Sequence, residues 1–225
     1  MTVPIERTAQ FGGPHRFELL GNVIDDPCNF SVHADSDIRD LKSLAAFARA
    51  NPGKVTVGSS GIGSDDHLLM LMFERAAGVK MTHVPFKGAA DVRTALISKQ
   101  ITVGAINIGE AQQSIKGGAP MRNIGQFAPG RTTVAPDLPT AREQGFPIEL
   151  SSLRGMAAPK GLPSDIRERL IKAVAQAAND PEFKEKATSV FAPLRYLSPA
   201  QFEREIKEAE AGFKQLWKEL PWGDK

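Results

Sequence analysis

Short apolar segments alternate with helix-like segments between residues 54 and 127, and this alternation constrains the fold more than any other feature of the sequence. Four segments have the length and apolar content of strands: KVTVGS (54–59), MTHVPF (81–86), ITVGAIN (101–107) and MRNIGQF (121–127). The segments between them have helical character: 64–77, closed by Gly78, then 89–98 and 110–116. Strands that alternate with helices of this length are typical of βαβ units. The sequence therefore predicts an α/β fold built on a parallel sheet.

The segment before this region predicts two short strands and one helix. Residues 17–24 and 30–33 are strand-like and are separated by Asp25-Asp26-Pro27. A helix is expected next, because apolar residues recur at helical spacing: Leu41, Leu44, Ala45 and Ala48. Asn51-Pro52-Gly53 then ends this helix.

The last third of the chain predicts three helices. Ser164 is the expected N-cap of the first, whose apolar face is Ile166, Leu170, Val174 and Ala177. The second covers about 181–190, and the third starts at Ser198-Pro199, a cap residue followed by proline at the first helical position. The third helix carries an apolar stripe made of Phe202, Ile206, Ala209, Phe213, Leu216 and Leu220. This stripe either docks on the sheet or forms the seam of a dimer.

Composition and charge exclude several classes of function. The chain has 28 basic and 26 acidic residues, scattered without a basic stripe, so nucleic acid is not an expected partner. No apolar run approaches the roughly 20 residues of a membrane helix. The single cysteine, Cys28, excludes an internal disulfide and is expected to be inert. The first twenty residues lack a basic segment followed by an apolar one, so no secretory signal is expected in this sequence.

The densest local motif is GSSGIGSDDHLL, whose first seven residues (58–64) we call the glycine–serine loop. A Walker-type phosphate loop needs a lysine where Ser64 stands, and the two acids that follow would repel a polyphosphate. A dinucleotide-binding fingerprint needs a third glycine where Asp66 stands. The motif therefore matches neither of these nucleotide-binding loops, and no cofactor is expected.

Catalysis and metal binding are also poorly supported by this motif. A nucleophile elbow around Ser60 would require glycine at the position of Ile62, and His67 lies too close in sequence to serve as a separate triad base. Asp65, Asp66 and His67 are consecutive on a helix, so they point in different directions and do not converge on one ion. Helix capping by Ser64, with two acids in the first helical turn, explains these residues better.

The geometry that remains is a glycine-rich turn between a strand and a helix, which presents backbone N–H groups and serine hydroxyls to a small polar ligand. In open α/β sheets ligands bind outside the carboxyl ends of the strands. The segments at 85–89 and 107–110 should lie at the same edge. Lys87 either pairs with a ligand acid or is a solvated loop lysine, and Asn107 either binds the ligand or caps the next helix. Glu110 is expected to be a helix-start acid.

Four segments resemble one known family: NPGKVTVGSSGIGSDDHL, GVKMTHVPFKGAADVRTAL, DLPTAREQGF and AAPKGLP. Their order and spacing are similar to those of the substrate-binding proteins of tripartite tricarboxylate transporters, the Bug receptors, from about Phe17 to the C-terminus. The resemblance implies a periplasmic receptor with a type II, two-lobe fold, which binds a small organic acid or amino acid without catalysis or a cofactor. It also implies membrane transporter subunits as partners.

The resemblance also implies which residues contact the ligand. The glycine–serine loop matches the family's carboxylate-binding loop, and 85–88 matches its second ligand loop. The ligand-binding residues expected on this basis are Ser59, Ser60, Gly61, Gly63, Ser64, Phe86, Lys87, Gly88 and Asn107. No residue is expected to be catalytic or to bind a metal.

The sequence departs from the family at two places. Asp65 and Asp66 stand where the family usually has proline after the last serine, so an inward-facing carboxylate would select an amine or a neutral group instead of an anion. The N-terminal part of the family pattern is also missing. Lobe 1 is therefore expected to be incomplete, with residues 1–52 and 149–225, and lobe 2 complete, with residues 53–148. Apolar helix faces that an incomplete lobe 1 would leave uncovered suggest that the chain forms a homodimer. The alternative to solute uptake is that the chain is a reduced homologue, which acts as a sensor or interaction protein through oligomerisation.

Overall fold

The computed structural model describes residues 16–222, so the expectations for the first fifteen residues lie outside it. The chain divides into two compact units. One is Asp26–Ser152, and the other combines the residues before Asp26 with those after Ser152. Each unit is described separately below.

The sheet of the unit Asp26–Ser152 has the strand order β3-β2-β4-β1-β5. Its strands are β1 (Phe17–His33), β2 (Thr56–Ser59), β3 (Thr82–Pro85), β4 (Val103–Asn107) and β5 (Met121–Gln126). β2 is parallel to β3 and β4, whereas β1 is antiparallel to both β4 and β5. The α/β class is confirmed, but the sheet is mixed instead of fully parallel, because β1 is inserted between two strands that run in the same direction.

β1 is one continuous strand of 17 residues, so the prediction of two short strands was wrong. Its second half pairs with β4 from Cys28, opposite Asn107, to Ser31, opposite Gly104. At the expected break, the N–H of Asp25 donates to the carbonyl of Pro193 at 3.0 Å, so this turn-forming residue is held in an extended ladder. Tertiary pairing here overrides the local preference of Asp-Asp-Pro for a turn.

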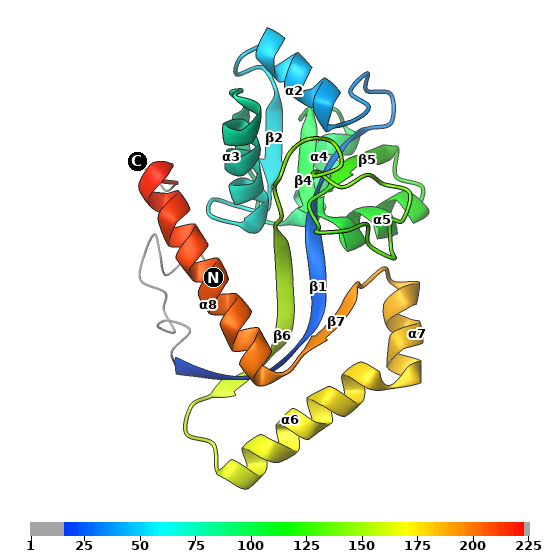
Figure 1. The fold of residues 1–225 in the computed structure, drawn as a ribbon. Coiled ribbons are helices and arrows are strands. Elements are labelled where there is room, and N and C mark those ends of the chain that lie inside the picture. The colour runs from blue at the N-terminus through cyan, green and yellow to red at the C-terminus, as the bar shows by residue number, and fades with distance from the viewer. Residues whose placement is uncertain (1–15, 223–225) are drawn as a thin grey trace. The chain divides into compact units, whose positions relative to one another are not determined.

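Helices cover both faces of this sheet (Figure 1). They are α2 (Leu41–Ala50), α3 (Asp65–Ala77), α4 (Ala89–Ile97) and α5 (Ile108–Lys116). One apolar layer joins α2 and α3 to the sheet and is centred on Phe30, Phe73 and Phe127. The other joins α4 and α5 to the opposite face through Leu96 and Ile106. Side chains that alternate along β4 supply both layers, as expected for a strand buried on two sides.

This unit begins earlier than the lobe 53–148 that the resemblance implies. Leu41 and Leu44 of α2 are fully buried in the same apolar layer as Phe73 of α3. The second half of β1 also belongs to this sheet. Residues 26–52 therefore lie in the unit Asp26–Ser152, because their packing partners are there.

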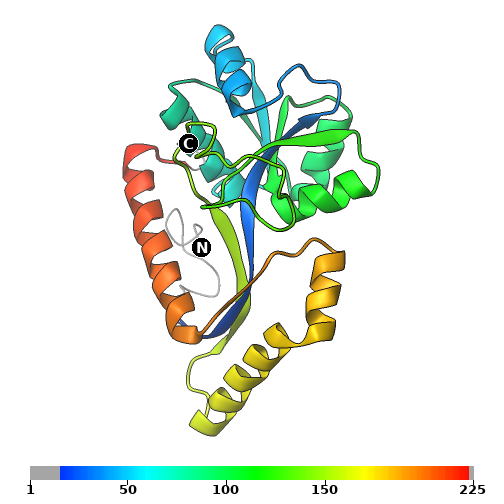
Figure 2. The same cartoon turned by 45° about the vertical axis from the view of Figure 1, so that its right-hand side comes forward.

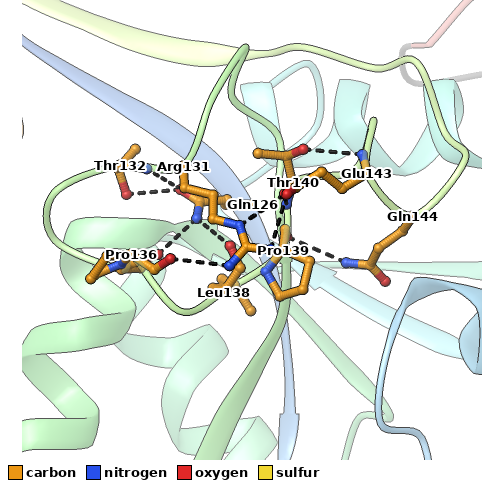
Figure 3. Close-up of polar contacts among 10 residues, drawn as sticks. Gln126, Arg131, Thr132, Pro136, Leu138, Pro139, Thr140, Glu143 and Gln144 are labelled. Atoms are coloured by element: carbon orange, nitrogen blue, oxygen red, sulfur yellow. Dashed lines mark hydrogen bonds and ion pairs between the residues drawn. The ribbon is translucent and has the colours of Figure 1, made fainter.

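A segment without helix or strand follows β5 and is organised by the buried side chain of Gln126 (Figure 3). Gln126 Nε2 donates to the carbonyls of Ala135 and Leu138 at 2.9 and 2.6 Å. Its Oε1 accepts from the N–H and the hydroxyl of Thr132 at 3.0 and 2.8 Å. These four bonds satisfy the buried amide. The backbone of Gln126 also pairs with this segment, since its N–H donates to the carbonyl of Pro139 and its carbonyl accepts from the N–H of Ala141.

The other unit contains two strands that the sequence did not predict, β6 (Ser151–Pro159) and β7 (Leu194–Leu197), and both pair with β1. Its helices are α6 (Ser164–Asn179), α7 (Pro181–Ser189) and α8 (Pro199–Glu219). α6 and α7 meet at a corner (Figure 2). Asp180 forms this corner, since its side chain caps α7 through the N–H of Phe183 at 2.9 Å. α8 begins as expected, with Gln201 accepting from the N–H of Ser198 at 2.9 Å.

Two predictions for these helices need correction. Ser164 is the first residue of α6, and Pro163 occupies the N-cap position without a side-chain cap. The predicted apolar face of α6 is not fully covered, since Ile166 is 42% exposed. In the stripe of α8, Phe202 and Leu216 are buried.

Candidate functional site

The glycine–serine loop joins the carboxyl end of β2 to the N-terminus of α3. Gly61 and Gly63 have φ angles of 135° and 73°, which side chains with a Cβ rarely adopt. Ser64 caps α3 as predicted, because its hydroxyl accepts from the N–H of His67 at 3.3 Å. The loop is therefore a tight turn that delivers the chain directly into a capped helix.

Asp65 and Asp66 both lie in the first turn of α3, where negative charge complements the helix dipole. Asp66 is buried and its side chain turns back onto the loop. One carboxylate oxygen, Oδ2, accepts from the backbone N–H and the hydroxyl of Ser60 at 3.1 and 2.6 Å. The other oxygen, Oδ1, is buried without a hydrogen-bond partner.

This environment disfavours the ionised form of Asp66. Burial, followed by the nearby charge of Asp65, raises the pKa of Asp66 to about 8, although the hydrogen bonds from Ser60 act in the opposite direction. The charge of Glu110 raises the same pKa further. The carboxyl group therefore titrates near neutral pH.

A pair of stacked histidines lies behind the loop. The rings of His67 and His83 are parallel with centroids 3.7 Å apart. Ser59 Oγ lies 2.6 Å from His83 Nε2, and the N–H of Gly63 donates to His67 Nδ1 at 3.1 Å. Burial, with a contribution from His83, lowers the pKa of His67 to about 4, and burial also lowers the pKa of His83. Both rings are neutral supports of the loop at pH 7.

No local motif in the sequence marks His83 as a contact of the loop. Its position in β3 places it opposite Val57 of β2, two residues before the loop begins to turn. A histidine in the strand next to the loop was the available signal, but the side chain's direction depends on the strand register, which the sequence alone did not give.

The three serine hydroxyls of the loop all direct their protons into the protein. Ser60 Oγ donates to Asp66, and Ser64 Oγ donates to the carbonyl of Gly61 at 2.8 Å. Ser59 Oγ lies 3.1 Å from the same carbonyl and 2.6 Å from His83 Nε2, and accepts from the N–H of Gly61. Each hydroxyl has one proton, so the oxygens of the half-buried Ser60 and Ser64 can accept a hydrogen bond from a ligand but cannot donate one, whereas Ser59 is fully buried.

Asp65 forms a second polar cluster at the same edge of the sheet. Its Oδ2 accepts from Ser152 Oγ at 2.5 Å, from Asn107 Nδ2 at 3.2 Å and from Cys28 Sγ at 3.5 Å. Asn107 Nδ2 also donates to the carbonyl of Asp26 at 2.8 Å. Asn107 occupies the N-cap position of α5, but its side chain does not cap the helix. Cys28 is buried, and this burial raises the pKa of its thiol.

Ser152 was missed because nothing in its own stretch of sequence marks it as a polar contact of Asp65. It stands at the start of β6, a strand that the sequence did not predict. Its hydrogen bond to Asp65 joins residues 87 positions apart in the chain.

The second predicted ligand loop lies against the first. The N–H of Phe86 donates to the carbonyl of Ser59 at 2.9 Å, and the ring of Phe86 packs close to Gly58. Lys87 is exposed on this turn. Gly88 occupies the N-cap position of α4. The structure therefore brings the two loops together within one unit, as their positions after neighbouring strands predicted.

The alternative chemistries are not supported by this geometry. Ser60 bonds to Asp66, and His67 accepts from Gly63, so these two side chains do not form a nucleophile–base pair. Within residues 16–222 there is no cluster of histidine, cysteine or acidic side chains suited to a metal ion. None of the helices in that range is long and apolar enough to cross a membrane.

Comparison with known proteins agrees with this arrangement. A protein encoded in the gbd 5′ region of Cupriavidus necator is 30% identical over 171 residues, covering 76% of this chain and 52% of the relative. Protein BugT of Bordetella pertussis is 28% identical over 154 residues, covering 68% of this chain and 47% of the relative. The chain thus spans about half the length of these curated relatives.

Solved structures share the fold over most of the chain. The periplasmic binding protein BugD is 28% identical, with a TM-score of 0.78 over 90% of this chain and 69% of its own. A protein of R. palustris, solved with adipate, is 24% identical, with a TM-score of 0.85 over 96% of this chain and 75% of its own. The family comprises receptors and binding proteins, not enzymes. Residues 10–221 match the tripartite tricarboxylate transporter family receptor, TctC, and the chain belongs to this family.

Proposed function

We propose that this chain is the solute-binding receptor of a tripartite tricarboxylate-type transport system, and that it binds a small carboxylate-containing solute without catalysis. The observation that carries the proposal is the contact between the glycine–serine loop and the Phe86–Gly88 turn at the carboxyl ends of β2 and β3. The exposed Lys87 of this turn would supply positive charge for the ligand's carboxylate, since Asp65 and Asp66 already complement the dipole at the N-terminus of α3.

The proposed ligand-binding residues divide by exposure. Ser60, Gly61 and Ser64 are half-buried, so a solute on the loop can reach them. Ser59 and Gly63 are buried and would act by holding the loop in shape. Phe86, Lys87 and Gly88 would form the neighbouring wall, with Lys87 as an exposed cation for a ligand carboxylate. Asn107 would act through Asp65, because both of its amide protons are directed to Asp26 and Asp65.

We further propose that the two compact units correspond to the two lobes of a type II binding protein, that the receptor works in the periplasm, and that it delivers solute to membrane transporter subunits. Family membership supports each of these points. The relatives solved with adipate and with malate provide a first panel of test solutes.

Self-association is a second candidate property, because five large apolar side chains are exposed among the described residues of the unit containing α6: Met156, Ile166, Leu170, Phe183 and Val190. Met156, Ile166 and Val190 are 54%, 42% and 50% exposed. Where exposed apolar side chains join into one patch, such a surface typically binds another chain. Light scattering over a range of concentrations tests this: a mass of two chains supports self-association, and a single-chain mass at every concentration contradicts it.

Isothermal titration calorimetry of the full chain tests the proposed receptor function. The panel contains small mono- and dicarboxylates, including adipate and malate, together with amino acids. We expect one class of carboxylate-containing solute to bind and Lys87→Gln to weaken its binding. Lys54→Gln is the matched control, since Lys54 is an exposed lysine outside the loops. Absence of binding across the panel, or equal effects of the two variants, would contradict the proposal.

A further inference from the structure

The two acids at the start of α3 lack positive partners among the residues that the structure describes. Asp65 Oδ2 accepts only from the neutral groups Ser152, Asn107 and Cys28. Asp66 accepts only from Ser60. The nearest imidazoles add no charge, because burial lowers the pKa values of His67 and His83. The site is therefore rich in acceptors and has no cation of its own behind the loop.

Ser60 is the residue through which the buried Asp66 affects which ligand groups can bind at the surface of the loop. Its single hydroxyl proton points at Asp66 Oδ2, 2.6 Å away, and its N–H points at the same oxygen. The hydroxyl oxygen of this half-buried residue then presents lone pairs to a ligand. A ligand carboxylate placed there would face an acceptor with a buried acid behind it. A ligand N–H group would find a hydrogen-bond acceptor.

Asp65 offers a second acceptor. Three donors hold its Oδ2. Its Oδ1 is not buried and has no hydrogen-bond partner among residues 16–222. A half-buried carboxylate oxygen oriented in this way is a strong acceptor for a charged donor.

Asp66 supplies an independent observation that points to a positively charged ligand. Its Oδ1 is buried and unpartnered, and a buried carboxylate without donor or cation is unfavourable. The carboxyl group can resolve this by holding a proton or by gaining a positive charge nearby. A bound cation on the solvent side of Ser60 would favour the ionised form.

We propose that the solute carries an ammonium group beside its carboxylate, and that this ammonium group is bound at Ser60 Oγ and Asp65 with the Asp66 carboxylate behind Ser60. This inference rests on the proposed receptor function and narrows its substrate class to amino-acid-like zwitterions. The solute's carboxylate would lie toward the Phe86–Gly88 turn, where Lys87 is the exposed cation. Simple dicarboxylates would be disfavoured.

Binding of the solute should change the number of protons held by Asp66. The groups that act on Asp66 are Asp65 and Glu110, which raise its pKa, and Ser60, which lowers it. Near pH 7 an ammonium ligand would shift Asp66 toward its ionised form and release a proton. A dicarboxylate would have the opposite effect, so Asp66 would retain or take up a proton.

Matched solute pairs test the proposal by calorimetry: alanine with propionate, aspartate with succinate, and 2-aminoadipate with adipate. Members of a pair differ only by the amino group. We expect at least one amino solute to bind at least tenfold more tightly than its partner, with net proton release when buffers of different ionisation enthalpy are compared. Asp66→Asn keeps an acceptor for Ser60 but removes the charge, and should reduce that ratio about tenfold.

Asp91→Asn is the control, since Asp91 is an exposed acid in the first turn of α4, and it should leave the ratio unchanged. If Asp66→Asn does not fold by circular dichroism, Asp65→Asn gives the same test. Dicarboxylates that bind as tightly as their amino partners would overturn this inference and leave the receptor function intact. A ratio unchanged in the aspartate variants would also overturn it. No binding of any solute would overturn both.

Discussion

Ser60 donates its backbone N–H and its hydroxyl to the same oxygen of Asp66, at 3.1 and 2.6 Å. The loop that was expected to offer free hydroxyl donors to a ligand thus directs a hydroxyl and an N–H to an acid of its own helix. Because of this contact, the serine oxygens that the loop exposes accept hydrogen bonds, and the loop is not a general binding site for anions. The contact also makes Asp66 the residue whose protonation state is most informative.

Asp66 should make the chain less stable as pH rises from about 4 to 8, and above about pH 6.5 His67 no longer offsets this effect. The folded pKa of Asp66, about 8, lies above the unfolded value near 4, so Asp66 binds more protons in the native state in this window and deprotonation costs stability. The slope is at most about 1.4 kcal/mol per pH unit. Urea unfolding at several pH values measures it. Asp66→Asn should flatten the curve and Asp91→Asn should not; parallel curves for all three proteins would contradict the assignment.

Between about pH 4 and 6.5 His67 should contribute a change of opposite sign, which offsets that of Asp66. Its folded pKa of about 4 lies below the unfolded value near 6.5, so His67 binds more protons in the unfolded state and its contribution to stability falls as pH decreases between these values. Without this offset, His67→Gln should lose stability more steeply than the wild type as pH rises from 4.5 to 6.5. Urea unfolding at pH 4.5, 5.5 and 6.5 provides the measurement. An unchanged acid slope in His67→Gln would argue against a buried neutral imidazole.

Gly63→Ala should destabilise the chain by about 1–2 kcal/mol, since a Cβ at φ 73° is strained. Gly130→Ala is the control, because Gly130 has no positive φ and a Cβ there meets open space. Midpoints of urea unfolding compare the two variants. Equal stability of Gly63→Ala and wild type would mean that the loop does not require this conformation.

Gln126→Leu should destabilise the unit Asp26–Ser152 by about 2–4 kcal/mol, because it removes four hydrogen bonds and leaves the carbonyl of the buried residue Ala135 without its partner. Gln100→Leu is a matched change at an exposed position. Thermal unfolding followed by circular dichroism compares them. A loss no greater than that of Gln100→Leu would show that the segment after β5 is held by other contacts.

The alternation of strands and helices was sufficient to predict the α/β class, the helices α2 to α4 and the cap at Ser64, because these depend on local periodicity and capping chemistry. It was not sufficient for β1, where pairing with β4 and β5 extends the strand through Asp25 and Asp26. β6 and β7 were missed for the same reason: they are strands through their pairing with β1. Long-range pairing is not encoded in the local pattern.

In the candidate site, too, local features could be predicted from the sequence and long-range contacts could not. Sequence placed the two loops at one edge of the sheet, and their contact through Phe86 and Ser59 agrees with that placement. Sequence did not show the direction of Asp66, which depends on a side-chain torsion at the helix start. It also did not show His83 and Ser152, whose roles arise from strand register and from a contact distant in the chain.

The most direct test of the account maps a bound solute onto the chain by nuclear magnetic resonance. Backbone amide shifts are recorded during titration with the tightest solute from the calorimetric panel. The account predicts saturable shifts concentrated in residues 58–66 and 85–88, with Ser60 and Asp65 among the largest. Saturable shifts confined to other parts of the chain, or no shifts at millimolar solute, would contradict it.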